Sequence, residues 1–237
     1  MVWGWAPHLE SRPGMIQAYI LVMALAIAYV AYLSPSRIHH DPPALRGLGT
    51  ARTGFVRTDN LRESLVPYGL LTLAGTLLLL GLALAGDASA PSRILERPFW
   101  VKLSFYLLSA LGQQLFFGSF LILRLRALFN AMPGATVRHP LRTRALICGT
   151  TALVFAVCHI PNLPMMGFAV ALSFSLGWIF YTRPNLLLAV LCHAWLGTLL
   201  NRVVLFPMRV GPFYGQPENY VYRILFPDLH RWLSTFF

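Results

Sequence analysis

Six apolar runs, separated by short polar loops, organise the whole chain. Four of them contain 20 or 21 uncharged residues, the length that an α-helix needs to cross a bilayer, and two have 17. We therefore predict an all-α, polytopic transmembrane helix bundle with about six spans, forming a single integral membrane domain over residues 1–237. The predicted spans are 14–33, 65–85, 103–123, 145–161, 163–182 and 185–201.

The composition excludes an ordinary soluble domain, because 57% of the 237 residues are hydrophobic and 11% are charged. A net charge of +11 often indicates a nucleic-acid partner, but here the arginines lie between apolar runs and anchor the topology. The positive-inside rule puts loops 34–64, 124–144 and 182–184, which hold most of the arginines, together on the cytoplasmic side. We expect membrane lipids as partners, no nucleic acid, and a location in a bacterial inner membrane.

The last segment, 207–237, has a different pattern from the apolar runs. It mixes aromatic residues with arginines, and Glu218 and Asp228 interrupt it. Such a mixture is typical of a segment that lies along the membrane surface. We therefore predict an interfacial tail here and no seventh span.

Polar side chains within the apolar runs are the strongest functional signal. His159 and His193 lie in two runs, and Gln113 and Gln114 lie in a third. All eight carboxylates fall outside the runs, so the site that these groups could form contains imidazoles and amides but no acid. A polar group inside a membrane costs several kcal/mol unless it meets a partner. Any one of the amides alone is explained by a bond between helices, but the set favours a shared site.

Helical spacing sorts these residues into three rows. Positions four apart share one face of a helix, and small residues allow neighbouring backbones to approach closely. We expect the three rows to face inward and to meet in one cavity within the membrane. The rows are Phe155 with His159, His193 with Gly197 and Asn201, and Gln114 with Gly118.

A cysteine precedes each of the two histidines, which suggests a metal site at first sight. Adjacent residues on a helix point about 100° apart, so the two side chains of one pair do not readily bind the same ion. We therefore expect no metal and no other cofactor. A small carrier, or a haem protein with two axial histidines, remains an alternative of a different class.

Three stretches of the second half resemble the CPBP family, the CAAX-protease and bacteriocin-processing (Abi-type) intramembrane proteases. They are 155–162, with an F-x-x-x-H motif that ends at His159 and is followed by Asn162, then 175–184, and then 191–195 around His193. The first family motif, E-E-x-x-x-R, corresponds here to Gln113, Gln114 and Gly118. The resemblance covers a core of about residues 103–206.

The resemblance implies roles for the matching residues. His159 and His193 would hold or polarise water and stabilise an oxyanion during peptide hydrolysis. Gln113 stands in the place of the glutamate that acts as the general base. Gln114 and Gly118 replace the second glutamate and the arginine.

The last family motif, H-x-x-x-N, is also altered. Gly197 stands where the asparagine is expected, and Asn201 follows one turn later. The carboxylates and their arginine are lost together, which leaves a neutral version of the site and no unpaired buried charge. Glutamine does not take a proton near neutral pH, so a neutral histidine would have to act as the base.

These observations leave two family-based functions open. The first is a CPBP-like intramembrane endopeptidase with a carboxylate-free active site, acting on a membrane-embedded or lipid-linked peptide client. The second is a catalytically inactive scaffold or partner-binding protein with the same fold.

Overall fold

The computed structural model describes residues 21–22, 24–49, 56–131 and 140–208, and within these ranges it contains helices and no strand. The predicted all-α membrane bundle is therefore confirmed. The helices in chain order are η1 (Tyr29–Ile38), α3 (Leu61–Leu84), η2 (Ala90–Leu95), α4 (Arg97–Gln113), η3 (Gln114–Leu121), α5 (Ile122–Ala131), α7 (Pro140–Val157), α8 (Leu163–Thr182) and α9 (Leu186–Arg202).

Four helices of the described residues are long and apolar enough to cross a membrane, and α9 is a shorter apolar helix. They correspond to the last five of the six predicted spans. The first predicted span, 14–33, lies partly outside the described residues. The predicted tail lies almost wholly outside them, since only Pro207 and Met208 are described. The protein is an integral membrane protein.

One span is longer than expected, because α4, η3 and α5 follow one another without a break. The candidate span in this continuous helix is Arg97–Phe129, where the sequence predicted 103–123. At about 1.5 Å per residue this exceeds the ~30 Å of a hydrocarbon core. Its two ends therefore extend beyond the hydrocarbon, and they carry the charged residues that ended the apolar run.

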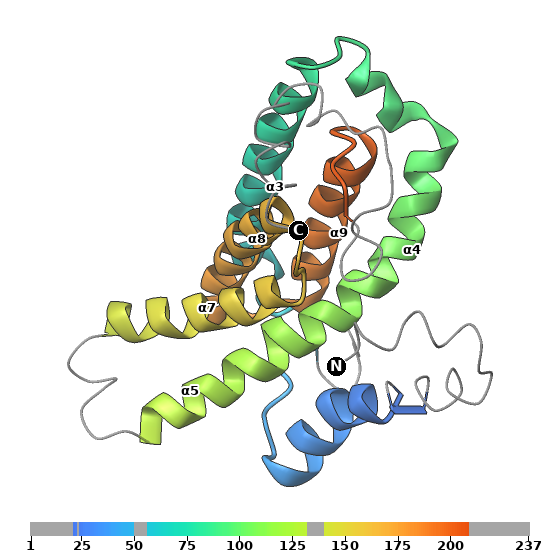
Figure 1. Ribbon diagram of the computed structural model, residues 1–237. Coiled ribbons are helices and arrows are strands. Elements are labelled where there is room, and N and C mark those ends of the chain that lie inside the picture. Colours follow the sequence, from blue (N-terminus) through green and yellow to red (C-terminus); the bar gives the residue numbers. More distant parts are fainter. Residues whose placement is uncertain (1–20, 23, 50–55, 132–139, 209–237) are drawn as a thin grey trace.

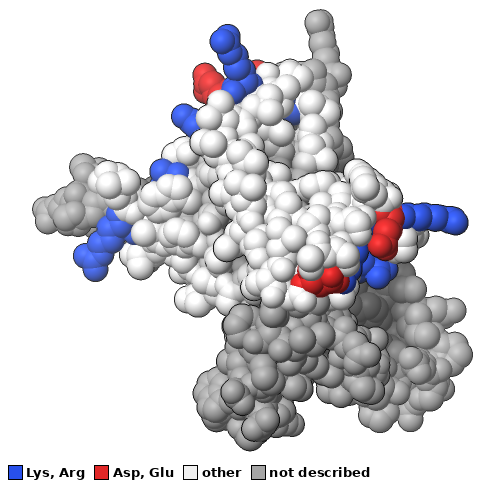
Figure 2. Space-filling model, turned by 90° about the horizontal axis from the view of Figure 1, so that it is seen from above, with Lys and Arg blue, Asp and Glu red and all other residues white. Residues whose placement is uncertain are grey.

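Helix α9 occupies the centre of the bundle. Eleven of its residues are buried, and it contacts α3, α4, α8 and η3. Figure 1 shows α9 between α3 and α4. Helix α3 lies at the edge, because only 11% of its most apolar stretch is buried and several of its leucines are exposed. In Figure 2 uncharged residues cover most of the visible face, and charged residues lie at its edges.

Helix α7 ends at Val157, four residues before the predicted end of its span. A proline disfavours the helical conformation of the residue before it, so Pro161 limits the helix on that side. Residues 158–161 form a turn, and the Asn162 side chain caps α8 by accepting a hydrogen bond from the Met165 N–H at 3.1 Å. His159 therefore lies in this turn and not on a helix.

The loops that were predicted to share one side of the membrane do meet. Arg57 and Asn60 both donate to the carbonyl of Pro184, each at 3.0 Å. The backbone N–H of Leu186 donates to the carbonyl of Gly47 at 2.9 Å. Gly47 has φ of +73°, and a Cβ at this position would approach the Leu186 nitrogen to 2.6 Å, so this contact requires glycine.

Asn185 is the fully buried link between this end and α9. Its Oδ1 accepts from the Leu188 N–H at 3.2 Å, and its Nδ2 donates to the Arg57 carbonyl at 3.0 Å and to Asn60 Oδ1 at 3.1 Å. We expect Asn185→Ala to lower the free energy of unfolding by about 1–3 kcal/mol, because it removes a helix cap and leaves buried groups unpaired. Chemical unfolding in detergent micelles measures this change. Asn201→Ala, near the other end of α9, is the control, and an equal loss in both variants would contradict the capping role.

Candidate functional site

Two adjacent cavities lie among the helices that carry the polar residues. The first, of about 290 Å³, is lined by His193 and by apolar side chains of α3, α8 and α9. The second, of about 410 Å³, is lined by Gln113 of α4 and by His159 of the turn that follows α7. Tyr106, Phe155 and Met165 line both cavities and form the wall between them.

The His193 imidazole is oriented by a hydrogen bond with Gln114, the second glutamine of the pair. Gln114 Nε2 lies 2.9 Å from His193 Nδ1, and both residues are buried, with exposed fractions of 6% and 2%. An amide nitrogen only donates, so Nδ1 accepts and the proton of the neutral imidazole is on Nε2. His193 can therefore offer an N–H donor to a ligand in the first cavity.

His159 has the opposite arrangement. Its Nδ1 lies 2.9 Å from the carbonyl oxygen of Phe155, and a carbonyl only accepts. The proton is therefore on Nδ1, and Nε2 keeps a free lone pair. The His159 side chain is half-buried and lines the second cavity, so this lone pair can accept a hydrogen bond or a proton.

The Phe155 ring contacts both imidazoles. Its centroid is 4.8 Å from that of His159 and 5.8 Å from that of His193, both in edge-on geometry. The two imidazoles therefore cannot be farther apart than these two distances combined. The helices that carry the histidines and the glutamine pair do come together, but His193 and His159 line two cavities and not the single one that was expected.

The two glutamines point to different neighbours. Gln113 Nε2 donates to Ser109 Oγ one turn earlier at 3.2 Å, and Gln113 Oε1 is buried without a hydrogen-bond partner among the described residues. Gln113 lines the second cavity with His159, whereas Gln114 reaches His193. In this structure it is Gln114, the residue at the place of the family's second glutamate, that contacts an imidazole.

The backbone around the pair is a π-helix, which starts at Gln114 and ends at Leu121. Such segments inside α-helices are frequent at functional sites. Gly118, also in this segment, leaves room for the Gln114 amide, because a Cβ at this position would approach Gln114 Oε1 to 2.8 Å. The neutral amide and the glycine that stand for a charged pair in the family thus fit each other.

Gly197 makes space for an aromatic ring that the sequence analysis did not single out. A Cβ at position 197 would overlap the Tyr106 ring, and this ring lies 5.8 Å from His193, centroid to centroid. The Tyr106 side chain therefore lies where a longer side chain at position 197 would begin. Its position two turns before Gln113 on the same helix is the one sequence signal that could have pointed to it.

The two asparagines take no part in lining the cavities. Asn162 is buried, caps α8, and donates from Nδ2 to the carbonyl of Pro207 at 2.8 Å, so it holds the turn that carries His159. Asn201 lies eight residues after His193, about 12 Å further along the helix axis. Helix α9 is regular up to Arg202, and Asn201 does not reach either cavity.

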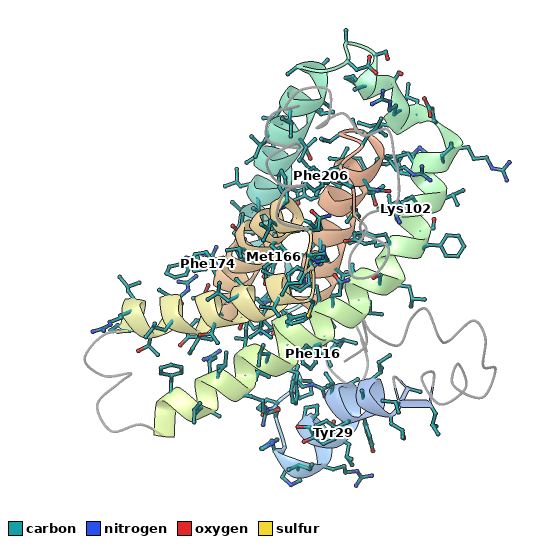
Figure 3. The ribbon with its side chains drawn as sticks, in the orientation of Figure 1. Tyr29, Lys102, Phe116, Met166, Phe174 and Phe206 are labelled. Atoms are coloured by element: carbon teal, nitrogen blue, oxygen red, sulfur yellow. The ribbon has the colours of Figure 1, made fainter. Side chains whose placement is uncertain are left out.

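Lys102 is the single charged residue among the described residues that line the two cavities. Its Nζ lies 5.8 Å from the centroid of the Tyr106 ring, and Figure 3 shows it on α4 beside α9. No carboxylate is among these described lining residues. In the described part of the chain, no three His, Cys, Asp or Glu side chains come together in an arrangement that suits a metal ion.

The chain was compared with known proteins at the level of families, of curated proteins and of solved structures. Residues 95–199 match the model of the family described as type II CAAX prenyl endopeptidase, Rce1-like. Curated proteins and solved structures show no significant match. The family match confirms the resemblance to the CPBP family of CAAX-type proteases, and the matched segment contains Gln113, Gln114, His159 and His193.

The fit between Gly197 and Tyr106 can be measured directly. We expect Gly197→Ala to lower the free energy of unfolding by about 1–3 kcal/mol, because the new methyl group overlaps the ring. Gly149→Ala in α7, with nothing within 4 Å of the new Cβ, is the control and should be neutral or slightly stabilising. Adding Tyr106→Ala to Gly197→Ala should recover part of the loss in a double-mutant cycle. Additive losses would show that the two positions are independent.

Proposed function

We propose that this member of the CAAX-type protease family is an intramembrane endopeptidase that works without a catalytic carboxylate. At the level of the family, the match over 95–199 supports peptide hydrolysis within a membrane. We assign the general base to His159, the oxyanion donor to His193, and the orientation of His193 to Gln114. Gln113 is assigned to hold the attacking water.

The opposite protonation of the two imidazoles carries this proposal. His159 keeps a free lone pair on Nε2 because its Nδ1 donates to the Phe155 carbonyl, and His193 keeps an N–H on Nε2 because its Nδ1 accepts from Gln114. Hydrolysis of an amide needs one group that takes a proton from water and one that stabilises negative charge on the carbonyl oxygen. The two histidines offer these two groups from opposite sides of Phe155.

The reaction then proceeds in two steps. The His159 lone pair takes a proton from water, the water oxygen bonds to the carbonyl carbon, and the carbonyl oxygen becomes an oxyanion that accepts from His193 Nε2–H. The C–N bond then breaks, and the His159 imidazolium gives its proton to the leaving nitrogen. The products are a carboxylic acid and an amine, and His159 returns to its neutral form.

Gln113 suits the task of holding water better than that of a base. Its side chain lines the same cavity as His159, and its Oε1 is buried without a hydrogen-bond partner among the described residues. A buried carbonyl oxygen of this kind favours a bound water, since an unsatisfied polar group costs about 1–3 kcal/mol. An amide between water and imidazole positions the water but takes no proton from it.

The shape of the first cavity favours an apolar substrate group. Leucine, phenylalanine and methionine side chains line most of it, and α9 adds the His193 imidazole. We propose a membrane-embedded or lipid-linked peptide as the client, with its apolar part in this cavity and its scissile bond near Phe155. The description of the matching family as a CAAX prenyl endopeptidase supports such a client.

The aromatic wall supports a second candidate function, in which the protein binds such a client without cleaving it. Tyr106 and Phe155 separate the two histidines, so Phe155 must move before one carbonyl group can reach both. If this movement does not occur, the cavities would still bind an apolar chain. A client that binds with unchanged length would favour this second function.

Single substitutions test the assigned roles. In proteoliposomes that contain a lipid-linked peptide, we expect His159→Ala and His193→Ala each to abolish cleavage, measured by mass spectrometry of the products. Gln114→Ala should slow cleavage by about 10²–10³-fold, because an unoriented donor stabilises the oxyanion poorly. Ser104→Ala, on the exposed side of α4, is the control and should leave the rate unchanged. Full activity of either histidine variant would contradict the mechanism.

Restoring the carboxylate gives a sharper test. Gln113→Glu returns the family's glutamate to a half-buried position within the membrane, without the arginine that Gly118 replaces. We expect this variant to unfold at lower temperature and to gain no activity, because an unpaired, partly desolvated carboxylate is disfavoured. Strong new proteolysis in an otherwise inert protein would refute histidine as the base and favour the binding function.

A further inference from the structure

We propose that Arg126 and Arg144, which lie against the ring of Tyr181, bind the phosphate group of an anionic phospholipid at the end of the bundle where α5, α7 and α8 meet. This inference is independent of the peptide chemistry proposed for the cavities. It concerns a surface on the described part of the chain that neither histidine reaches.

Two guanidinium groups from different helices lie close to one tyrosine ring. Arg126 of α5 has its Cζ 4.5 Å from the Tyr181 ring centroid, and Arg144 of α7 has its Cζ 5.7 Å from the same centroid. Arg144 also lies over the Trp178 ring, with its Cζ 3.8 Å from that centroid. These contacts hold both arginines in place, so a ligand that bridges them needs little additional ordering.

The partners of the two guanidinium groups among the described residues are uncharged. Arg126 donates to the Tyr181 carbonyl at 3.3 Å, and Arg144 donates to the Trp178 carbonyl and to Thr182 Oγ1. The carbonyl end of helix α8 supplies roughly half a negative charge. This does not balance two guanidinium groups, and Arg183, exposed immediately after α8, adds a third positive charge.

The described acidic residues either form ion pairs with other arginines or lie in other parts of the fold. The three described ion pairs join Arg57 to Asp59, Arg93 to Asp87, and Arg124 to Asp41. Helix α5 thus contains a paired arginine, Arg124, and, two residues later, an arginine without an acidic partner. In Figure 2 the blue atoms at the left edge, where α5 ends and α7 begins, have no red atoms beside them.

The surroundings point to a lipid as the source of the missing anion. Tryptophan and tyrosine favour the headgroup level of a membrane, and Trp178 and Tyr181 lie in the last turns of a spanning helix. Basic pockets between spanning helices bind anionic headgroups. Arginine has five N–H donors in a planar fork that matches phosphate, and neither residue uses all of them in these bonds.

Lipid titration of the full-length protein tests the proposal. Binding of dioleoyl-phosphatidylglycerol and dioleoyl-phosphatidylcholine to the detergent-solubilised protein is followed by native mass spectrometry and by the shift in unfolding temperature. We expect R126Q/R144Q to bind phosphatidylglycerol about 30-fold more weakly, from the contribution of two basic residues near an anionic headgroup. The control R97Q/R202Q removes two exposed arginines at the other ends of α4 and α9 and should change this affinity less than about threefold.

Two further variants keep the result interpretable if R126Q/R144Q folds poorly. R126K/R144K retains the charge and should keep a preference for phosphatidylglycerol. R183Q removes an exposed arginine and should weaken binding of phosphatidylglycerol by about fivefold without lowering the unfolding temperature in phosphatidylcholine. An equal loss in both lipids for all variants would mean that the arginines only cap α8 and would overturn the proposal. Full competition by millimolar inorganic phosphate would overturn the assignment to a lipid.

Discussion

The polar side chains of α9 must find their partners inside the bundle, because the surrounding lipid offers none. Because of this requirement, the described helices pack around α9, which is a shorter apolar helix than the four candidate spans. His193 meets Gln114, Trp195 donates to Thr76 Oγ1 of α3 at 2.9 Å, and Asn185 binds the loop before α3. Each of these contacts joins α9 to a different element. Hydrogen bonds to α9 therefore add to apolar packing in positioning α3 and η3.

The same requirement explains the distribution of charge. Asp41, Asp59 and Asp87 lie outside the spanning helices and pair with arginines, and the described residues that line the cavities include no carboxylate. The Gln114 amide and the His193 imidazole satisfy each other in the interior at a smaller cost than charged groups would incur, and His159 bonds a backbone carbonyl. A site of this kind depends on which nitrogen of each imidazole carries the proton. The hydrogen bond from Gln114 places the proton of His193 on Nε2, and the bond to the Phe155 carbonyl places that of His159 on Nδ1.

The hydrophobic pattern located most of the spans, because length and the absence of charge are local properties of the sequence. Residue types also identified both histidines and the glutamine pair as site candidates, because a polar side chain inside an apolar run is costly unless it has a partner. The pattern did not predict that Gln113 and Gln114 have different neighbours, since this depends on the π-helical turn that begins between them. It extended α7 by one turn, because the apolar run continues through the residues before Pro161. Tyr106 was missed because a tyrosine in an apolar run resembles any other core residue, and only the space left by Gly197 gives it a role.

Two pairs of residues in the site are complementary in size, and this limits how the sequence can change. Tyr106 fits against Gly197, and the Gln114 amide fits against Gly118. A larger side chain at position 197 would overlap the Tyr106 ring, whereas one at position 118 would first meet the flexible end of Gln114, which can shift but also orients His193. A change at Gly197 is therefore accessible only together with, or after, a change at Tyr106. The evolution of α9 at this position is thus tied to that of α4.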